Sequence, residues 1–254
     1  MKFKIMTNNM FFIANWKMFG DLKSVNSIKK VIKISKNKKY KKAQIIYCPP
    51  FTLIDKFLRL VKNTKIDIGA QNCHYSENPG PFTGSVNTDL IKSIGAKYVI
   101  IGHSENRASG DNNKTINLKI KSALKKKLKV IFCIGETLKE RKNNRTNRIL
   151  NSQITLGLKK IKKNNNIIFA YEPVWSIGTG VIPKSDSLKK QIFLIKKMIN
   201  RIWKLKGPKV LYGGSVNSKN ITDLKKINSI NGFLIGGASQ NSKNFIDIIK
   251  KTIN

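Results

Sequence analysis

The sequence has few cysteines and no long apolar segment. Its three cysteines, Cys48, Cys73 and Cys133, are too few and too scattered for a disulfide framework or a zinc site, which favours a reducing compartment. No apolar run approaches the roughly 20 residues needed to span a bilayer. The apolar stretch of residues 10–14 is too short for a signal peptide. We therefore expect a cytoplasmic protein with no membrane partner.

Arginine is also scarce, although positive charge is abundant. The 254 residues carry a formal net charge of +37, with 44 lysines and only six arginines. A protein that reads nucleic acid is expected to use arginine, because its planar fork matches phosphates and guanine edges. Lysine, asparagine and isoleucine make up 109 of the residues and can all be encoded without G or C. An AT-rich genome thus accounts for the charge, and we expect no specific nucleic-acid partner.

No G-x-G-x-x-G motif follows the first predicted strand, which argues against a dinucleotide-binding fold.

Short runs of β-branched and aromatic residues recur along the chain. They are nearly continuous in apolar character, as expected for parallel strands that are covered on both faces. The predicted strands are residues 11–15, 44–48, 66–70, 97–101, 129–133, 167–171, 209–212 and 232–235.

Lysine-rich amphipathic segments between these runs predict helices. The apolar face of residues 52–62 comprises Leu53, Phe57, Leu60 and Val61, and that of residues 244–253 comprises Phe245, Ile248, Ile249 and Ile253. Eight strand–helix units without a linker or composition shift predict one α/β domain, residues 1–254, folded as a single eight-stranded parallel (β/α)8 barrel. A doubly wound open sheet is the alternative on periodicity alone.

Polar residues gather at the C-terminal ends of the predicted strands, where barrels of this kind form their active sites. Asn15 and Lys17 end the first strand on one side. His103 and Glu105 follow the fourth strand, and Glu172 follows the sixth. Each residue alone has an ordinary explanation, such as a solvated lysine or a glutamate that starts a helix. Their joint placement predicts a catalytic site.

Glycine pairs follow the last two predicted strands, in YGGS (212–215) and IGGAS (235–239). Glycines let backbone N–H groups approach an anion closely, and barrels often hold phosphate after strands 7 and 8. A tight turn is the ordinary explanation for one such pair. Two pairs at these positions predict a phosphate site.

At these positions the sequence resembles the triosephosphate isomerase family, from Phe12 to about Phe245. The segment YEPVW followed by IGTG matches the mobile lid of that family. About ten residues, 1–10, precede the usual start. The motifs that carry the resemblance are ANWKM (14–18), CPPFT (48–52), GAQN (69–72), FTG (82–84), IGHSE (101–105), CIGE (133–136), AYEPVW with IGTG (170–180), YGGSV (212–216) and IGGAS (235–239).

The resemblance implies a TIM-barrel aldose–ketose isomerase of glycolysis and gluconeogenesis. It would interconvert dihydroxyacetone phosphate and D-glyceraldehyde 3-phosphate by proton transfer through an enediolate. Glu172 would be the base, neutral His103 the electrophile and Lys17 the fixed positive charge. These roles are those of the family, a standard example of acid–base chemistry in a barrel.

The resemblance implies the supporting roles in the same way. Asn15 would position Lys17 and the substrate, Glu105 would be the countercharge of Lys17, and Cys133 would pack behind the base. No metal or organic cofactor is implied. Backbone N–H groups would hold the phosphate at Gly178, Ser215, Gly236 and Gly237.

The resemblance further implies a two-fold homodimer, in which the third strand–helix loop inserts Thr83 into the partner's site. That loop, residues 73–86, is too long for a simple connector and carries the bulky Phe82. Near this contact Ser85 and Asn106 replace a Glu and an Arg of the usual pattern. In the lid, Ser176 replaces the usual Ala.

Two other functions remain as alternatives. A barrel recruited to nucleic acid or membrane by its basic surface would tolerate loss of its catalytic residues, yet every matched position is intact. A Schiff-base aldolase of the barrel class would need a lysine on the sixth strand, and IIFAYE (167–172) has none. The isomerase is therefore the function that we expect.

Overall fold

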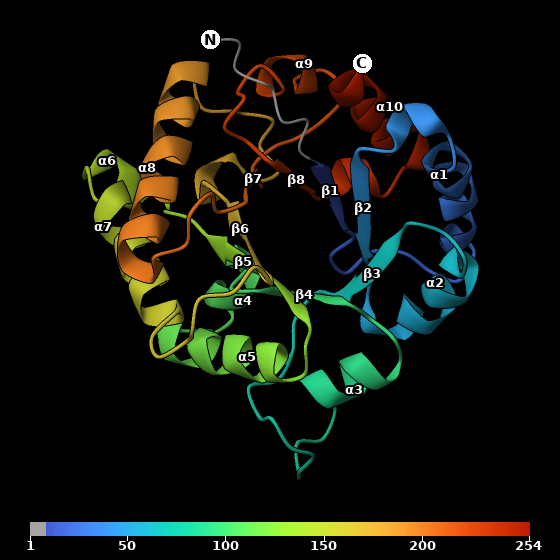
Figure 1. Ribbon diagram of the computed structural model, residues 1–254, viewed down its shortest axis with the longest axis horizontal. Coiled ribbons are helices and arrows are strands. Elements are labelled where there is room, and N and C mark those ends of the chain that lie inside the picture. Colours follow the sequence, from blue (N-terminus) through green and yellow to red (C-terminus); the bar gives the residue numbers. More distant parts are fainter. Residues whose placement is uncertain (1–8) are drawn as a thin grey trace.

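The computed structural model describes residues 9–254, which form a closed barrel of eight parallel strands surrounded by helices (Figure 1). Each strand pairs with its neighbours in chain order, and the barrel closes where β1 (Met10–Asn15) pairs with β8 (Gly232–Ile235). This is the predicted TIM barrel, and it excludes the doubly wound sheet. The other strands are β2 (Ala43–Cys48), β3 (Asp67–Ala70), β4 (Tyr98–Ile101), β5 (Lys129–Ile134), β6 (Ile167–Tyr171) and β7 (Val210–Tyr212).

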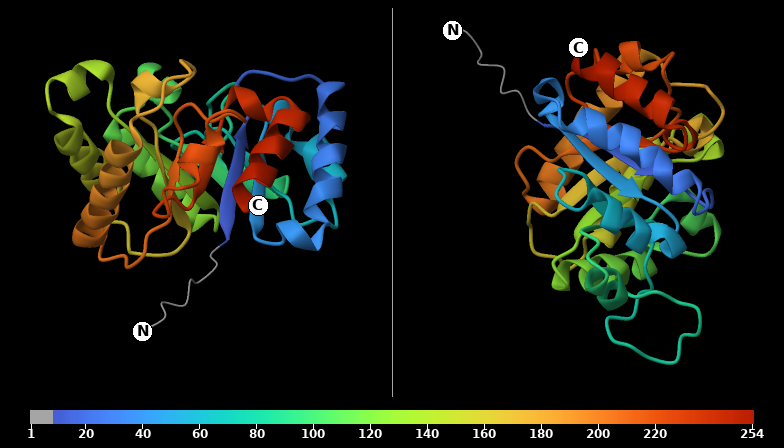
Figure 2. Two further views of the ribbon diagram at one scale, coloured as in Figure 1. Left: turned by 90° about the horizontal axis from the view of Figure 1, so that it is seen from above. Right: turned by 90° about the vertical axis from the view of Figure 1, so that its right-hand side faces the viewer.

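The longer helices pack around the outside of the barrel (Figures 1 and 2). Within residues 9–254, no helix is long and apolar enough to cross a bilayer. The α-helices are α1 (Ile28–Ser35), α2 (Ile54–Val61), α3 (Thr88–Ser93), α4 (Ser104–Ala108), α5 (Asn113–Lys125), α6 (Leu138–Lys142), α7 (Thr146–Gly157), α8 (Ser185–Trp203), α9 (Ile221–Leu224) and α10 (Ser242–Ile253). Two short 3-10 turns, η4 (Val174–Ser176) and η5 (Gly237–Ser239), follow β6 and β8.

The eight predicted strands are confirmed, each to within one residue at either end. The helix predicted over residues 52–62 is α2, preceded by a 3-10 turn over residues 51–53. Its buried face differs slightly from the prediction: Ile54 is buried and Leu60 is only half-buried. Because α2 begins at Ile54, the residues at i, i+3 and i+7 are Ile54, Phe57 and Val61, and these three face the barrel.

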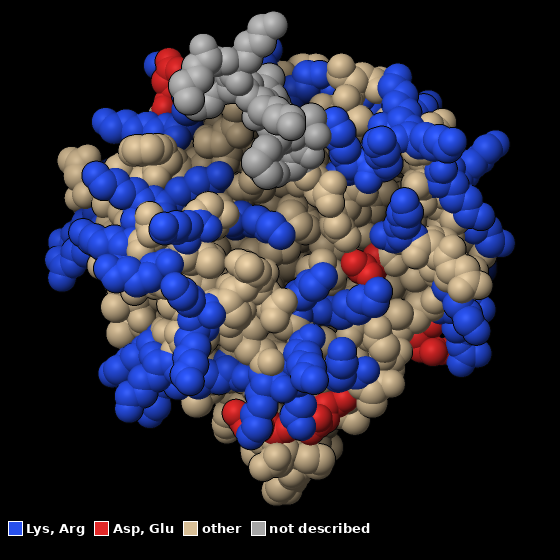
Figure 3. Space-filling model, viewed as in Figure 1, with Lys and Arg blue, Asp and Glu red and all other residues tan. Residues whose placement is uncertain are grey.

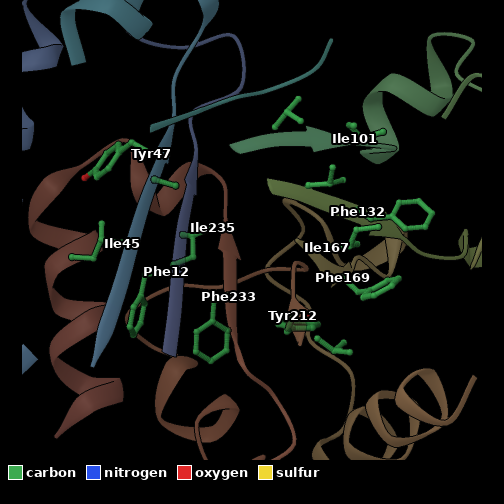
Figure 4. Close-up of a cluster of buried hydrophobic side chains, with 14 of the residues drawn as sticks. Phe12, Ile45, Tyr47, Ile101, Phe132, Ile167, Phe169, Tyr212, Phe233 and Ile235 are labelled. Carbon is green, nitrogen blue, oxygen red and sulfur yellow. The ribbon is translucent and has the colours of Figure 1, made fainter. Parts of the chain in front are cut away.

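Successive residues of each strand point to opposite faces and build two separate cores. One core fills the barrel and includes Ile13, Cys48 and Leu234. The other lies between the strands and the helices, where the rings of Phe12 and Phe233 on adjacent strands are 6.3 Å apart (Figure 4). Because both faces of every strand are covered, the strands appear in the sequence as continuous apolar runs.

Two surface features distinguish the molecule. The loop between β3 and α3 projects away from the barrel (Figures 1 and 2). Lysine and arginine side chains are spread over the whole visible face rather than gathered in one stripe (Figure 3). A dispersed distribution of this kind is expected of lysines on solvated surfaces, whereas a nucleic-acid site concentrates its charge on one face or along one helix.

Candidate active site

A cavity of about 330 Å³ opens at the C-terminal ends of the strands. It brings together eight of the predicted site residues. Glu105 and Cys133 are not among the residues that line it, although each contacts one that does. Thr83 lies elsewhere, exposed on the projecting loop. The predicted residues in the cavity wall are Asn15, Lys17, His103, Glu172, Gly178, Ser215, Gly236 and Gly237.

Lys17 reaches the cavity through an unusual backbone turn. The sequence pattern predicted that Asn15 and Lys17 project to one side of a continuing strand, but β1 ends at Asn15 and Lys17 has a φ of +53°. Such left-handed conformations are uncommon outside glycine. The Lys17 N–H donates to Oδ1 of Asn15 at 3.0 Å, and Nε2 of Gln71 donates to the Lys17 carbonyl at 2.8 Å. Hydrogen bonds on both sides of the residue thus hold the turn.

The charged end of Lys17 is paired with Glu105. Its Nζ atom lies 2.6 Å from Oε1 of Glu105, and the lysine side chain is 22% exposed. This is the arrangement expected of a countercharge that keeps the cation extended toward the cavity. Because the carboxylate is more exposed than the lysine, solvent screens the pair, and the contact orients the lysine more than it stabilises the fold.

His103 begins α4 and is almost fully buried, with 5% of its surface exposed. Its Nδ1 atom accepts the backbone N–H of Glu105 at 3.3 Å. An imidazole nitrogen that accepts carries no proton, so this hydrogen bond assigns a neutral ring with its proton on Nε2. The Nε2 atom lies 3.4 Å from Oε1 of Glu172. The histidine therefore presents an N–H group to the cavity.

Glu172 follows β6 and is 2% exposed. Burial raises the pKa of its carboxyl group above the ordinary value, while His103, the Cys133 thiol and the backbone N–H of Ser104 act in the opposite direction. A raised pKa makes the carboxylate a stronger base than a solvated one. The site is also tightly shaped, because a Cβ atom on Gly213 would lie 2.8 Å from Cγ of Glu172.

Cys133 is completely buried on β5, behind the glutamate. Burial raises the pKa of its thiol well above the ordinary value, so the group stays protonated and hydrogen-bonds to Glu172. This agrees with a packing role and not with a nucleophile. The sequence did not point to Arg107, which donates to the carbonyls of Gly102 at 2.8 Å and Cys133 at 3.2 Å and so ties β4 to β5.

A buried carboxylate at Glu136 holds the segment that follows β6, and the sequence had suggested no role for it. Glu136 is fully buried and accepts hydrogen bonds from the Tyr171 hydroxyl and from Nε1 of Trp175, each at 3.1 Å. Arg141 stacks on the Trp175 ring, with its guanidinium carbon 4.7 Å from the ring centre. An acidic residue directly after a buried strand, in CIGE (133–136), was the signal that could have identified it.

Two glycines of the cavity wall have open space beside their backbone. A Cβ atom on Gly178 or Gly237 would meet no atom within 4 Å. Gly237 also begins η5, so backbone N–H groups at this turn are available to an anion. Among residues 9–254, no group of three His, Cys, Asp or Glu side chains is placed to hold a metal ion.

Comparison with known proteins agrees with this geometry. The family model described as triosephosphate isomerase matches residues 10–252. The triosephosphate isomerase of Dictyoglomus thermophilum is 40% identical over 244 residues, covering 93% of this chain and 97% of that protein. That of Thermodesulfovibrio yellowstonii is 39% identical over 244 residues, covering 94% and 98%.

A solved structure is similar over almost the same span. The crystal structure of triosephosphate isomerase from Bartonella henselae has a TM-score of 0.86 and 32% sequence identity, and the match covers 96% of this chain and 98% of that one. Of the ten N-terminal residues expected to precede the family's usual start, residues 1–8 lie outside the described part of the chain. The chain belongs to the triosephosphate isomerase family.

Proposed function

We propose that Glu172, His103 and Lys17 carry the reaction of this family, the interconversion of dihydroxyacetone phosphate and D-glyceraldehyde 3-phosphate. The observation that carries the proposal is the 3.4 Å approach of His103 Nε2 to Glu172 Oε1, in a cavity that Lys17 also lines. A proton acceptor, a proton donor and a fixed cation are thus within reach of one small substrate.

Glu172 removes a proton from the substrate carbon next to the carbonyl group and returns it to the neighbouring carbon. The electrons of the broken C–H bond move to the carbonyl oxygen, and the intermediate is an enediolate. The raised pKa of the buried carboxyl group supports this role, because a base works best when its pKa approaches the working pH. The reaction consumes no external oxidant or reductant, because the proton is only moved from one carbon atom of the substrate to the next.

His103 polarises the carbonyl oxygen with its Nε2–H group and moves protons between the two oxygens. The hydrogen bond from the Glu105 N–H to Nδ1 supports a neutral ring, which can donate and accept in turn. Lys17 stabilises the negative charge of the enediolate and of the phosphate, the electrostatic contribution that is usually largest in enzymes. Asn15 positions Lys17 through the hydrogen bond to its backbone N–H.

The phosphate binds to the backbone N–H groups of Gly178, Ser215, Gly236 and Gly237. The open space beside Gly178 and Gly237 supports the assignment, and Gly236 lies against the Lys17 side chain. The lid, residues 173–183, closes over the bound substrate. Closure excludes water and keeps the enediolate from losing its phosphate group.

We further propose that two copies of the chain form a homodimer through the projecting loop. Phe82 and Tyr75 at its tip are 40% and 44% exposed, and Met18, which follows Lys17, is 94% exposed. His74 stacks against both loop aromatics, with ring centres 4.2 Å and 4.3 Å apart, so the tip has a defined shape. A partner that covers these apolar groups would receive Thr83 beside its own Lys17.

Location and domain organisation are proposed on simpler grounds. Cys48, Cys73 and Cys133 are all free and buried, which supports a reducing compartment such as the cytoplasm. The strand–helix units follow one another around the barrel, which supports a single domain.

The experiment is a coupled assay of the purified chain with each triose phosphate in turn. We expect interconversion in both directions, without added cofactor and without loss of rate in a chelator. A chain that binds the substrates but produces neither product would contradict the proposal, as would activity that appears only when nucleic acid or lipid is added.

A further inference from the structure

Ser176 is the last residue of η4, the turn that begins the lid, and it is fully buried. Its Oγ atom lies 2.5 Å from the Val181 carbonyl oxygen and 2.9 Å from the Tyr212 hydroxyl oxygen. The backbone nitrogen of Ser215 lies 3.4 Å away, a long hydrogen bond. One hydroxyl group therefore links two parts of the lid to the end of β7 and to the loop that is proposed to hold phosphate.

The chemistry of these groups fixes the direction of each hydrogen bond. The Val181 carbonyl can only accept, so the Ser176 hydroxyl donates its single hydrogen there. The Ser215 N–H can only donate, and it occupies one lone pair of the serine oxygen. The Tyr212 hydroxyl must then donate to the other lone pair. The serine hydroxyl thus uses its full hydrogen-bonding capacity.

The two hydroxyl groups pack closely against the backbone of Gly214. A Cβ atom on Gly214 would collide with both the Tyr212 and the Ser176 hydroxyl groups. Tyr212 is itself fully buried, and within residues 9–254 its hydroxyl bonds to Ser176. Alanine at position 176 would leave the buried Tyr212 phenol without its acceptor, which is costly. It would also remove the donor to the Val181 carbonyl.

We propose that the Ser176 hydroxyl is a positioning group that ties the lid to the phosphate-binding loop. The inference rests on the proposed function of that loop. The hydroxyl joins Ser176 to Val181 across the tip of the lid, so the intervening residues 177–180 stay over the cavity. It also gives the Ser215 N–H an acceptor in the absence of substrate. When substrate binds, a phosphate oxygen takes the place of the serine oxygen and forms a shorter, charge-assisted hydrogen bond.

Without the hydrogen bonds of the Ser176 hydroxyl, we expect the lid to close less completely over the intermediate. In an incompletely covered enediolate, the electrons expel the phosphate: the carbon–oxygen bond to phosphate breaks and phosphate leaves with the electron pair. The remaining three-carbon enol tautomerises to a dicarbonyl compound. Inorganic phosphate released per isomerisation therefore reports on lid position, and a loss of stability alone would not change it.

The test compares Ser176→Ala and Tyr212→Phe with Ser35→Ala, which removes a hydroxyl group that donates to the Ile32 carbonyl of its own helix, α1. We expect Ser176→Ala to raise the KM for dihydroxyacetone phosphate and the phosphate released per turnover by about tenfold each, the loss expected for a buried hydrogen bond. Tyr212→Phe should act in the same direction. The double variant should be less impaired than the product of the two single effects, because both remove one connected set of bonds.

A parent-like KM and phosphate ratio in Ser176→Ala would overturn the proposal, as would equal changes in Ser35→Ala. Circular dichroism establishes that each variant is folded. If Ser176→Ala does not fold, Ser176→Cys, which fills the space but forms weak hydrogen bonds, decides by the same two readouts. Failure of the parent chain to isomerise triose phosphates would instead contradict the proposed function, so the two failures are distinguishable.

Discussion

The Nε2 atom of His103 and the Oε1 atom of Glu172 lie 3.4 Å apart, and both side chains are anchored at the same corner of the barrel. His103 is oriented by the N–H of Glu105, and Glu172 accepts the N–H of Ser104, so the start of α4 holds the proposed electrophile and the proposed base. Their relative position is therefore set by one short turn. Small changes in the reach of either side chain should have large effects on turnover.

Shortening the proposed base tests this sensitivity. Glu172→Asp keeps the charge but retracts the carboxylate by about 1 Å, and we expect turnover to fall on the order of 10²-fold or more. Steady-state kinetics of the variant measures the effect. Glu140→Asp, at the half-buried start of α6 and outside the cavity, serves as the matched control. Parent-like turnover in Glu172→Asp would mean that this residue is not the base.

The Cys133 thiol should set the pH at which activity declines in acid. Its hydrogen bond stabilises the ionised form of Glu172 and so lowers the pKa of that carboxyl group. In Cys133→Ala the pKa should rise further, and the acid limb of the kcat/KM profile should move to higher pH, because the protonated base is inactive. Cys73→Ala removes a buried thiol that does not contact Glu172 and should leave the limb in place. A limb that moves to lower pH contradicts the assignment.

Glu172 should also lower the stability of the fold at neutral pH. The pKa of its carboxyl group is raised in the folded state, so the folded chain binds the proton more tightly than the unfolded one. The free-energy cost of ionisation is absent below the unfolded pKa, grows as pH rises through the folded pKa, and is complete above it. Glu172→Gln should therefore raise the denaturation midpoint at about pH 8 and leave it nearly unchanged at about pH 4. An equal gain at both values would point to a cause other than ionisation.

The proposed dimer should depend on salt. Both copies carry a large positive charge, and their repulsion is screened less at low ionic strength. We expect a dimer at physiological salt that dissociates on dilution in low salt, with activity falling in parallel. Sedimentation at graded salt, run beside the isomerase assay, measures both quantities. Full activity in a demonstrable monomer would contradict the dimer proposal.

The positive surface should bind nucleic acid only weakly. Lysines dispersed over the surface attract phosphates without reading bases, so binding should be independent of sequence and largely lost by about 0.2 M salt (Figure 3). Fluorescence anisotropy with unrelated oligonucleotides at two salt concentrations measures this. Tight, sequence-selective binding at the higher concentration would instead revive a nucleic-acid-binding role.

The strands could be predicted because each is buried on both faces, which leaves a continuous β-branched run in the sequence. The residues of the cavity wall could be predicted because motifs at the ends of those runs resemble a family. Gln71 could not, since its role depends on a partner in a distant segment, the Lys17 carbonyl. For Glu136 the position after a buried strand was a signal, but its partners Tyr171 and Trp175 come together only in the folded chain. The left-handed turn at Lys17 was equally hidden, because lysine is not a residue that signals it.

The pairing of β1 with β8 has a consequence for the synthesis of the chain. Phe11 lies beside Gly232 in the finished barrel, so the first strand emerges from the ribosome long before the strand that completes its hydrogen bonding. Throughout that interval one edge of the sheet is unpaired, and such an edge is a template for joining another chain. Neighbouring nascent chains with many lysines and few acidic residues repel one another. We therefore expect the excess of lysine to oppose aggregation before the barrel closes.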